Sequence, residues 1–385
     1  MKVVAVKVPI QDPVDVLFIV PRFHTNYIGW LHGLSRLGIS FRMLVQTIGV
    51  SENHSLLTPQ KIEPNEDYFK ISFLKKWKFK RFFILFMHIK RLKPKLIIFR
   101  FELSFTSLVF LVNIILSRTR LLIYLQWPLH GASYPKRFIR TFFTLILRIP
   151  TVTPVLSRND SWIGDSRNNT VSHRSFFIPF GMPLQQSAST PIDLPSRIGS
   201  LRFLTVGKFQ QRKNHMGTME CLMNNDKFRN SDSTFEIIGE VSNAEHNKVL
   251  SEIKGYVLEN NLEHKFLISL NKNHSEVLKK IQECDVFILM SCAEPASISN
   301  VEAMSHGKPI IIKSGNGTAN YIKDERGGFI VDSPEEFEKT LNLLFDHPDF
   351  IERSFNENLA TVKELLDPES VASKLLNCAK YEVKM

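Results

Sequence analysis

Residues 285–312 read DVFILMSCAEPASISNVEAMSHGKPIII, and the fold is predicted outward from this stretch. The apolar run at residues 285–290 is typical of a buried strand, and a second such run begins at Pro309. Between the two runs lie a polar loop and a short helix that begins near Asn300 and ends by Gly307, a residue that favours helix termination. Two strands joined by a helix predict a parallel β-α-β unit.

The same alternation continues along the chain in both directions. Short apolar runs are separated by helical stretches, which predicts parallel sheets covered by helices on both faces. The runs are residues 15–20, 41–45, 96–99, 121–125, 152–155, 201–206, 234–238, 265–269, 285–290, 309–313 and 328–331. Residues 177–199, FIPFGMPLQQSASTPIDLPSRIG, interrupt the alternation and are rich in Pro, Ser and Gly. We therefore predict two α/β domains, at residues 1–180 and 200–368, a linker at 181–199, and a C-terminal helix at 369–385. The sequence leaves open whether this helix packs on the second domain or crosses back to the first.

Length and composition fit this organisation. A chain of 385 residues suits two domains of ordinary size, and 43% hydrophobic with 23% charged residues is typical of a soluble globular protein. The N-terminal stretch is interrupted by proline and aspartate, which argues against a signal peptide. The longest apolar run, residues 105–116, is too short to cross a bilayer, and we predict a buried helix there. The four cysteines and twelve histidines show no metal-ligand spacing, which favours a cytoplasmic protein without a metal site.

The net charge of +11 is concentrated between Lys70 and Lys95, which read KISFLKKWKFKRFFILFMHIKRLKPK. Cationic and aromatic side chains are interleaved there. Such a face can bind an anionic membrane surface, or it can be a solvated helix with an apolar stripe toward the core. Nucleic acid is disfavoured as a partner, because no recognition motif accompanies the charge.

Cations follow a predicted strand at residues 204–214, LTVGKFQQRKN. The strand ends at Gly207, and Lys208, Arg212 and Lys213 come before the next helix. Ligands of open α/β sheets lie outside the carboxyl ends of the strands, where cations suit a phosphate or a diphosphate. Basic loop residues of this kind can also be merely solvated.

Two carboxylates occupy the stretch at residues 285–312. Glu294 lies in the loop after the strand, and Glu302 lies in the first turn of the helix, which Ser297, Ser299 or Asn300 could cap. Glu302 would be favourably placed at the positive end of the helix dipole even without a ligand, and Glu294 could be an exposed loop residue. Because carboxylates repel a diphosphate, Glu294 and Glu302 would have to bind hydroxyl groups of a ligand if they bind a ligand at all.

Together these segments resemble the second domain of GT-B glycosyltransferases of family 4, which carry an E-x7-E motif. The matching text is VGKFQQRKN, EPASISNVEAMSHGKPII and GNGTANYI, and the likeness covers about residues 200–332. FFIPFGMP resembles the start of the family's interdomain linker. The resemblance implies an α/β GT-B fold, in which two Rossmann-like domains face each other across a donor-binding cleft, the first binding the acceptor and the second a nucleotide-sugar.

The resemblance also implies a role for each matching residue. Glu294 would bind hydroxyls of the donor sugar, and Glu302 the two ribose hydroxyls. Lys208 and Lys213 would bind the diphosphate. The donor site would be completed by the amides of Ile298 and Ser299, and by Ser297, Gly207, Gly239, Glu240, Leu270, Thr25 and Asn26. Acceptor-side candidates are His24, Gln126 and His130.

The chain departs from the family pattern at four places. Ala296 and Ser297 replace a Phe-Gly pair, and Lys208 replaces a more frequent arginine. A guanidinium that can form two parallel hydrogen bonds to a phosphate is thereby replaced by a single ammonium charge. The first-domain loop reads PRFHTNYIG instead of carrying paired glycines. Gln126 stands where relatives often present a histidine, and His130 follows four residues later.

The resemblance implies a retaining, metal-independent hexosyltransferase without a cofactor. It would move a sugar from a UDP- or GDP-linked donor to a hydroxyl of a glycan or lipid-linked acceptor, in bacterial surface polysaccharide synthesis at the inner face of the cell membrane. The alternative is a catalytically inactive GT-B subunit that binds the nucleotide-sugar within a transferase complex. A dinucleotide-dependent oxidoreductase is disfavoured, because no GxGxxG follows the first strand.

Overall fold

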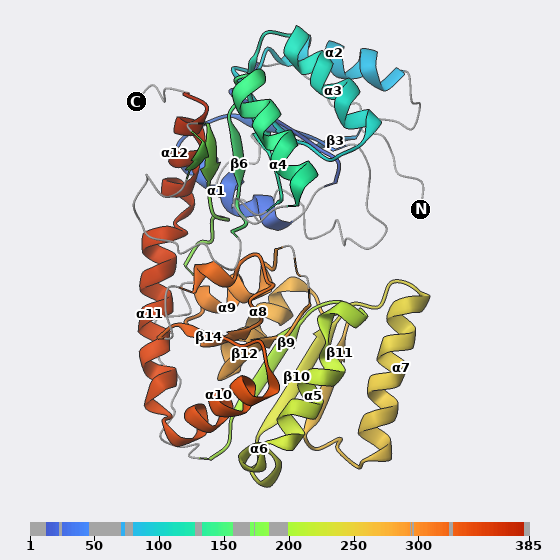
Figure 1. Ribbon diagram of the computed structural model, residues 1–385, viewed down its shortest axis with the longest axis vertical. Helices are drawn as coiled ribbons and strands as arrows, with labels where there is room; N and C mark the ends of the chain where they lie inside the picture. The colour runs from blue at the N-terminus through green and yellow to red at the C-terminus, as the bar shows by residue number, and fades with distance from the viewer. Residues whose placement is uncertain are drawn as a thin grey trace.

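The computed structural model describes residues 13–22, 25–45, 71–73, 80–127, 133–156, 170–172, 174–184, 199–292, 294, 296–322 and 326–380. Within them the chain forms two α/β domains stacked along the long axis of the molecule (Figure 1). The predicted fold class is thus confirmed at the level of two helix-covered sheets.

The first domain contains an eight-stranded sheet with the order β3-β2-β1-β4-β5-β6-β8-β7. All described pairs are parallel except β7 with β8. The strands are β1 (Val16–Val20), β2 (Phe41–Val45), β3 (Ile71–Phe73), β4 (Leu96–Arg100), β5 (Arg120–Tyr124), β6 (Thr151–Thr153), β7 (Thr170–Ser172) and β8 (Ser175–Phe177). The helices are η1 (Thr25–Tyr27), α1 (Ile28–Arg36), α2 (Lys80–Leu92), α3 (Phe105–Leu116), α4 (Tyr134–Thr141) and the π-helical η5 (Phe142–Ile146).

The second domain contains a parallel sheet with the order β11-β10-β9-β12-β13-β14. Its strands are β9 (Arg202–Val206), β10 (Thr234–Gly239), β11 (Phe266–Leu270), β12 (Val286–Leu289), β13 (Ile310–Ile312) and β14 (Gly328–Ile330). Its helices are η8 (Gln211–Lys213), α5 (His215–Asn224), α6 (Asp226–Asn230), α7 (Ala244–Glu259), α8 (His274–Glu283), α9 (Ser299–Ser305), η9 (Ala319–Tyr321), α10 (Pro334–Asp346) and α11 (Asp349–Leu365). The strand order reverses between β9 and β12, which is where a doubly wound sheet binds its ligand.

Alternate side chains of the first sheet face two separate helix layers. Val16 and Phe18 of β1 pack with α1 and the C-terminal helix α12 (Pro368–Cys378). Leu17 and Ile19 pack instead with α2, α3 and η5. The C-terminal helix therefore belongs to the core of the first domain, although it follows the second domain in sequence. α1 and α12 approach closely at Gly33, where an added Cβ would lie 1.9 Å from the carbonyl oxygen of Pro368.

Residues 105–116 form the predicted helix, but the prediction that this helix is buried is wrong. α3 has the predicted bounds, and Phe110, Leu111 and Ile114 are buried in the core. However, Phe105 is 81% exposed, and Leu116 is 64% exposed. A strongly apolar composition is typical of a helix enclosed on all sides, and it cannot reveal that this helix covers only one face of a sheet.

The two domains are joined at the carboxyl end of the first sheet. The hydroxyl of Tyr321 donates to the carbonyl of Pro154, directly after β6, at 2.8 Å, and accepts from the amide of Phe180 at 2.9 Å. Met182 N donates to Leu366 O at 2.7 Å. Burial raises the pKa of the Tyr321 phenol, so its proton stays in place at neutral pH. Because parallel strands share one carboxyl edge, the residues that follow β1, β4 and β5 lie on the edge that adjoins the second domain.

No helix in the described part of the chain is long and apolar enough to cross a membrane. The segment between Lys70 and Lys95 forms β3 and α2, but the side chains of residues 71–84 lie outside the description. Its role at a membrane surface stays a prediction.

Candidate active site

The candidate site lies where the order of the second sheet reverses. The loop after β9 leads through η8 into α5, and the loop after β12 leads into α9. Asn214 links η8 to α5 with a left-handed φ of 54°, a conformation that asparagine tolerates better than most residues. The two loops are joined by the amide of Cys292, which donates to Arg212 O at 2.7 Å. Side chains from both loops therefore meet at the switch point.

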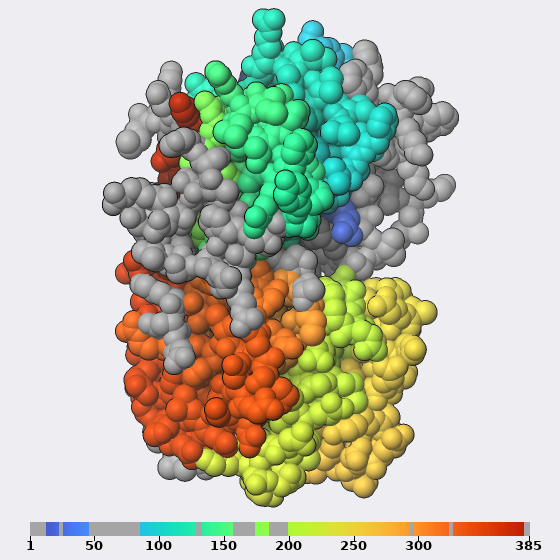
Figure 2. All heavy atoms as spheres, viewed as in Figure 1, coloured from blue at the N-terminus to red at the C-terminus, as the bar shows by residue number. Residues whose placement is uncertain are grey.

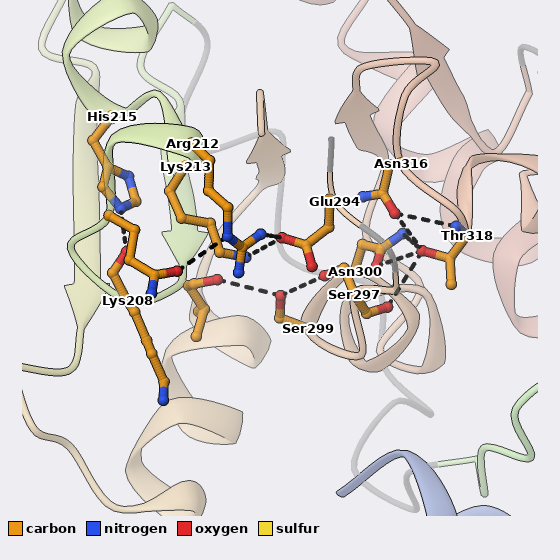
Figure 3. A network of polar contacts seen from close by, with 12 residues as sticks. Lys208, Arg212, Lys213, His215, Glu294, Ser297, Ser299, Asn300, Asn316 and Thr318 are labelled. Atoms are coloured by element: carbon orange, nitrogen blue, oxygen red, sulfur yellow. Dashed lines mark hydrogen bonds and ion pairs between the residues drawn. The ribbon is translucent and has the colours of Figure 1, made fainter. Parts of the chain in front are cut away.

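Glu294 lies between the side chains of the two loops (Figure 3). Its Oε2 atom lies 2.6 Å from Lys213 Nζ and 2.5 Å from Arg212 Nη1. The loop that carries it is held in turn by the amide of Gly317, which donates to Glu294 O at 2.9 Å. Glu294 is only 5% exposed. The carboxylate thus binds two cations at once, and the interpretation of Glu294 as an exposed loop residue is wrong.

Lys213 is buried with its partner. Burial lowers the pKa of the Lys213 ammonium, and the Glu294 carboxylate opposes that shift. The stem of Lys213 crosses Gly207, where an added Cβ would lie 3.1 Å from Lys213 Cε. Glycine at the end of β9 therefore leaves the space through which the ammonium reaches Glu294.

Lys208 takes a different direction from the two cations beside Glu294. Its side chain extends away from them in Figure 3, and its Nζ lies 3.5 Å from Glu240 Oε2, after β10. Its backbone carbonyl contacts the Nε2 atom of His215 at 3.3 Å. His215 is buried, and this burial lowers its pKa to about 4, so the imidazole is neutral at pH 7. The structure therefore brings Lys213 to Glu294 but places Lys208 toward Glu240.

Glu302 is paired with a residue that the sequence did not suggest. His274 Nε2 lies 2.7 Å from Glu302 Oε1. His274 is the first residue of α8, which begins with a capping box formed by Asn273 and Glu276. The capping residues signal the start of a helix, but nothing in the local sequence directs the His274 side chain to a helix that begins 25 residues later.

The loop before α9 is held by a polar network rather than by a helix cap. Ile298 is the N-cap residue and makes no side-chain cap hydrogen bond, so the predicted cap by Ser297, Ser299 or Asn300 is not formed. The hydroxyls of Ser297 and Ser299 lie 3.0 Å apart, and Asn300 Nδ2 donates to Thr318 Oγ1 at 3.1 Å. The network fixes this loop against the segment after β13.

The same network extends to Asn316. Its Oδ1 accepts from the Thr318 amide at 3.1 Å and from the Thr318 hydroxyl at 2.9 Å. Asn316 is buried, and its Nδ2 atom has no hydrogen-bond partner within the described ranges. A buried donor of this kind is costly unless a ligand or water accepts from it.

The remaining donor-side candidates lie at the carboxyl ends of β10 and β11. Gly239 ends β10 and is covered by Phe209, because an added Cβ would lie 2.3 Å from that ring. Glu240 follows β10 and Leu270 ends β11 at the same edge of the sheet, and Leu270 is exposed. They line the side of the switch point that is farthest from β13.

The first-domain candidates are only partly described. Thr25 and Asn26 lie in η1, after β1, and Gln126 lies two residues after β5. The Oε1 atom of Gln126 is buried, with no partner among the residues that the structure describes. His24 and His130 lie outside the described residues. Within the described part of the chain, no hydrogen bond joins Asn26 or Gln126 to Glu294 or Glu302.

Arg100 is a further residue that sequence reasoning missed. It ends β4 at the order reversal of the first sheet, and its Nη1 donates to the Tyr27 hydroxyl at 3.3 Å. Its guanidinium lies 3.6 Å from Glu102 and 5.7 Å from the ring centroid of Tyr124. A single arginine at the end of an apolar run carries no motif, so only the topology reveals its position. No group of three or more His, Cys, Asp or Glu side chains in the described part of the chain is arranged to hold a metal ion.

Comparison with known proteins agrees with this geometry. The family described as Glycosyl transferases group 1 matches residues 193–359, which include both loops of the site. A curated relative, an uncharacterised glycosyltransferase of Methanocaldococcus jannaschii, is 27% identical over 122 residues, which are 31% of this chain and 33% of the relative. That match spans about a third of the relative's length.

Solved structures extend the likeness to the whole fold. A glycosyltransferase from Rickettsia africae ESF-5 superposes with a TM-score of 0.73 at 15% identity, covering 95% of this chain and 98% of that chain. Anabaena HepE in complex with UDP superposes with a TM-score of 0.70 at 12% identity, covering 95% and 99%, and the same protein has been solved with UDP-glucose. The chain therefore has the GT-B fold of glycosyltransferases, and its second domain matches the group 1 glycosyl transferases.

Proposed function

We propose that this protein transfers a sugar from a nucleotide-sugar to a hydroxyl of a glycan or lipid-linked acceptor, with retention of the anomeric configuration. The observation that carries the proposal is the buried Glu294 between Arg212 and Lys213, at the order reversal of the second sheet. Two cations and one carboxylate leave a net positive charge there, which suits a diphosphate better than a neutral ligand. The family match over residues 193–359 and the UDP-bound HepE structure support the same donor class.

The proposed roles combine the family resemblance with the observed contacts. Arg212 and Lys213 bind the diphosphate, and Glu294 is released from them to accept hydrogen bonds from hydroxyls of the donor sugar. Glu302, oriented by His274, binds the two ribose hydroxyls. Lys208 and the amides of Ile298 and Ser299 complete the diphosphate site. A UDP-linked hexose is the donor that the HepE complexes favour over a GDP-linked one.

The proposed reaction needs no group beyond donor, acceptor and these residues. The bond between the anomeric carbon and the β-phosphate oxygen breaks, and the diphosphate leaves with that electron pair. The acceptor oxygen forms the new bond on the same face of the sugar, and its proton passes to the departing phosphate. Arg212 and Lys213 stabilise the charge that develops on the diphosphate, a contribution of roughly 3 kcal/mol for one such contact.

Surface polysaccharide synthesis at the inner face of a membrane is the setting that we propose. The basic and aromatic composition between Lys70 and Lys95 supports contact with anionic lipid, where a lipid-linked acceptor would be present. Gln126, at the carboxyl edge of the first sheet, is the acceptor-side candidate whose position the structure describes.

The test measures nucleotide release from UDP- and GDP-sugars, with and without acceptor saccharides. Lys213→Ala and Glu294→Gln should each lower acceptor-dependent release about a hundredfold or more, because each removes a contact to the transition state or the donor. Lys279→Ala, at an exposed position on α8, is the matched control and should behave like the parent protein. Circular dichroism and thermal unfolding verify that each variant is folded.

Two outcomes would contradict the proposal. If both site variants retain more than about a tenth of the parent activity, Lys213 and Glu294 do not take part in the reaction. Binding of UDP without release of nucleotide from any donor would favour the alternative, a non-catalytic subunit of a transferase complex.

Metal independence is a separate prediction of this proposal. Because Arg212, Lys213 and Lys208 supply positive charge to the diphosphate, we expect full activity in the presence of excess EDTA. Assays after dialysis against EDTA, with and without added Mg²⁺ or Mn²⁺, test this expectation. A loss of activity that Mg²⁺ or Mn²⁺ restores would contradict it.

A further inference from the structure

An extended apolar surface covers the outer side of the first domain. Of the 17 exposed large apolar side chains in the described part of the chain, twelve lie between residues 87 and 146. The described residues of the second domain, which include nearly all of that domain, expose only four: Leu258, Leu267, Leu270 and Ile330. An apolar patch concentrated in this way marks an interaction site.

On α3 the exposed apolar residues form one stripe. They recur at helical spacing along the outer side, opposite the buried face of the helix, and are Phe105, Leu108, Val112, Ile115 and Leu116. The buried face of the same helix includes Ser107 and Asn113. The helix therefore turns part of its polar surface inward and most of its largest apolar side chains outward, which core packing does not require.

A second stripe runs along α4 and its π-helical continuation η5. The first four members recur every three to four residues, and the stripe consists of Tyr134, Phe138, Phe142, Leu145 and Ile146. Tyr134 is 87% exposed and Phe138 is 65% exposed. The opposite side of this helix packs inward through Phe143, which contacts Phe101 with ring centroids 5.0 Å apart.

The two stripes lie in one layer. The inner faces of α3 and η5 contribute to the same hydrophobic cluster on one side of the first sheet. Figures 1 and 2 show α3 and α4 next to each other at the surface of that side. We call the ten side chains of the two stripes the α3–α4 face.

The charge around the α3–α4 face is almost entirely positive. Residues 80–148 contain thirteen lysines and arginines and a single acid, Glu102. Arg118 and Arg120 follow the α3 stripe, Lys136 and Arg137 lie within the α4 stripe, and all four are exposed. The apolar side chains are thus flanked by cations at both stripes.

We propose that the α3–α4 face docks on the surface of an anionic lipid bilayer. Amphipathic helices that carry large apolar side chains beside lysine and arginine bind at the headgroup level, where apolar burial and attraction to anionic lipid add together. A second copy of this chain is a poor occupant, because it would bring two cationic surfaces into contact. The surface lies on other residues than the segment at 70–84, and it does not depend on sugar transfer.

Vesicle flotation of the full chain tests the proposal without donor or acceptor. The protein should float with vesicles of phosphatidylcholine and 30% phosphatidylglycerol, and much less with pure phosphatidylcholine. Binding should weaken as NaCl rises from 50 to 500 mM, since screening reduces the electrostatic contribution. Equal binding to both vesicle types, or no binding to either, would overturn the proposal.

A pair of variants locates the surface. Phe138→Ser with Leu145→Ser should lower vesicle partitioning at least tenfold, because two large exposed side chains no longer enter the bilayer. Leu258→Ser with Leu267→Ser on the second domain is the matched control and should bind like the parent protein. If the first pair leaves vesicle binding unchanged and instead abolishes a dimer seen by light scattering, the face is a protein interface and the proposal is wrong. Nucleotide release with a soluble acceptor is measured on the same variants. This assay tests the proposed reaction independently of membrane binding, so a failure of one proposal can be told from a failure of the other.

Discussion

At the scale of single residues, Glu294 is the counter-ion of Arg212 and Lys213. Removal of water from Lys213 and Glu294 is costly, and their mutual attraction offsets part of this cost, while Arg212 stays partly exposed. A diphosphate would supply the negative charge that Glu294 now supplies. In the proposed function, donor binding and the release of the Glu294 carboxylate would therefore be parts of one exchange.

The pair formed by His274 and Glu302 gives a prediction for nucleotide affinity. His274→Ala should weaken UDP binding about tenfold, because the Glu302 carboxylate loses the partner that orients it. His274→Gln should lose less, since its amide can still donate to Glu302. Isothermal titration calorimetry measures both dissociation constants. Unchanged affinity in the alanine variant would show that His274 does not position the carboxylate.

His215 gives a prediction for stability against pH. Its pKa is about 4 in the folded protein, below the usual histidine value of 6.5, so the unfolded chain binds a proton more readily. Stability from this group is complete above pH 6.5 and is lost as the pH falls toward 4. Between pH 7 and pH 5 the parent protein should lose about 2 kcal/mol more than His215→Gln does. Urea unfolding at both pH values measures the difference, and an equal loss in the two proteins would contradict it.

At the scale of elements, the turn after α9 depends on Gly307. Its φ is +73°, and an added Cβ would lie 2.3 Å from the ring of Phe355 in α11. Gly307→Ala should destabilise the protein by about 2 kcal/mol, because a left-handed conformation and a shifted ring both cost free energy. Gly255→Ala, inside α7 where an added Cβ has room, is the matched control and should stabilise by roughly 0.5–1 kcal/mol. Urea unfolding of both variants compares them, and equal changes would contradict the role of Gly307.

The strands and helices of the second domain were predictable because their apolar runs are local signals. The run at residues 285–290 became β12, and the helix predicted near Asn300 became α9. The pairing of His274 with Glu302, the inward position of Arg100 and the exposure of α3 were not predictable. Each depends on which elements lie side by side, and a sequence pattern of period two or 3.6 reports only which residues share a face.

At the scale of the whole molecule, the first domain is completed by the last helix of the chain. Leu375 of α12 is fully buried in the cluster that contains β1 and α1. Leu375→Ala should cost about 2–5 kcal/mol and raise hydrogen exchange in α1, more than 300 residues earlier in the sequence. UDP should still stabilise the second domain of this variant. The exposed Leu258 of α7 provides the control, and a Leu258→Ala effect as large as that of Leu375→Ala would contradict the assignment.

The bonds of Tyr321 to Pro154 and Phe180 join the two domains, and they would serve as the pivot of a rotation of one domain against the other. For any rotation of the domains about a pivot, displacement grows with the length of the lever arm. Tyr321 follows β13, and β12, β9, β10 and β11 lie at successively greater distances from it, about 5 Å per strand. The Glu294 loop, after β12, therefore has a shorter lever arm than Leu270, at the end of β11. A small angular change would therefore alter the surroundings of Leu270 while Glu294 keeps nearly constant geometry relative to the first domain.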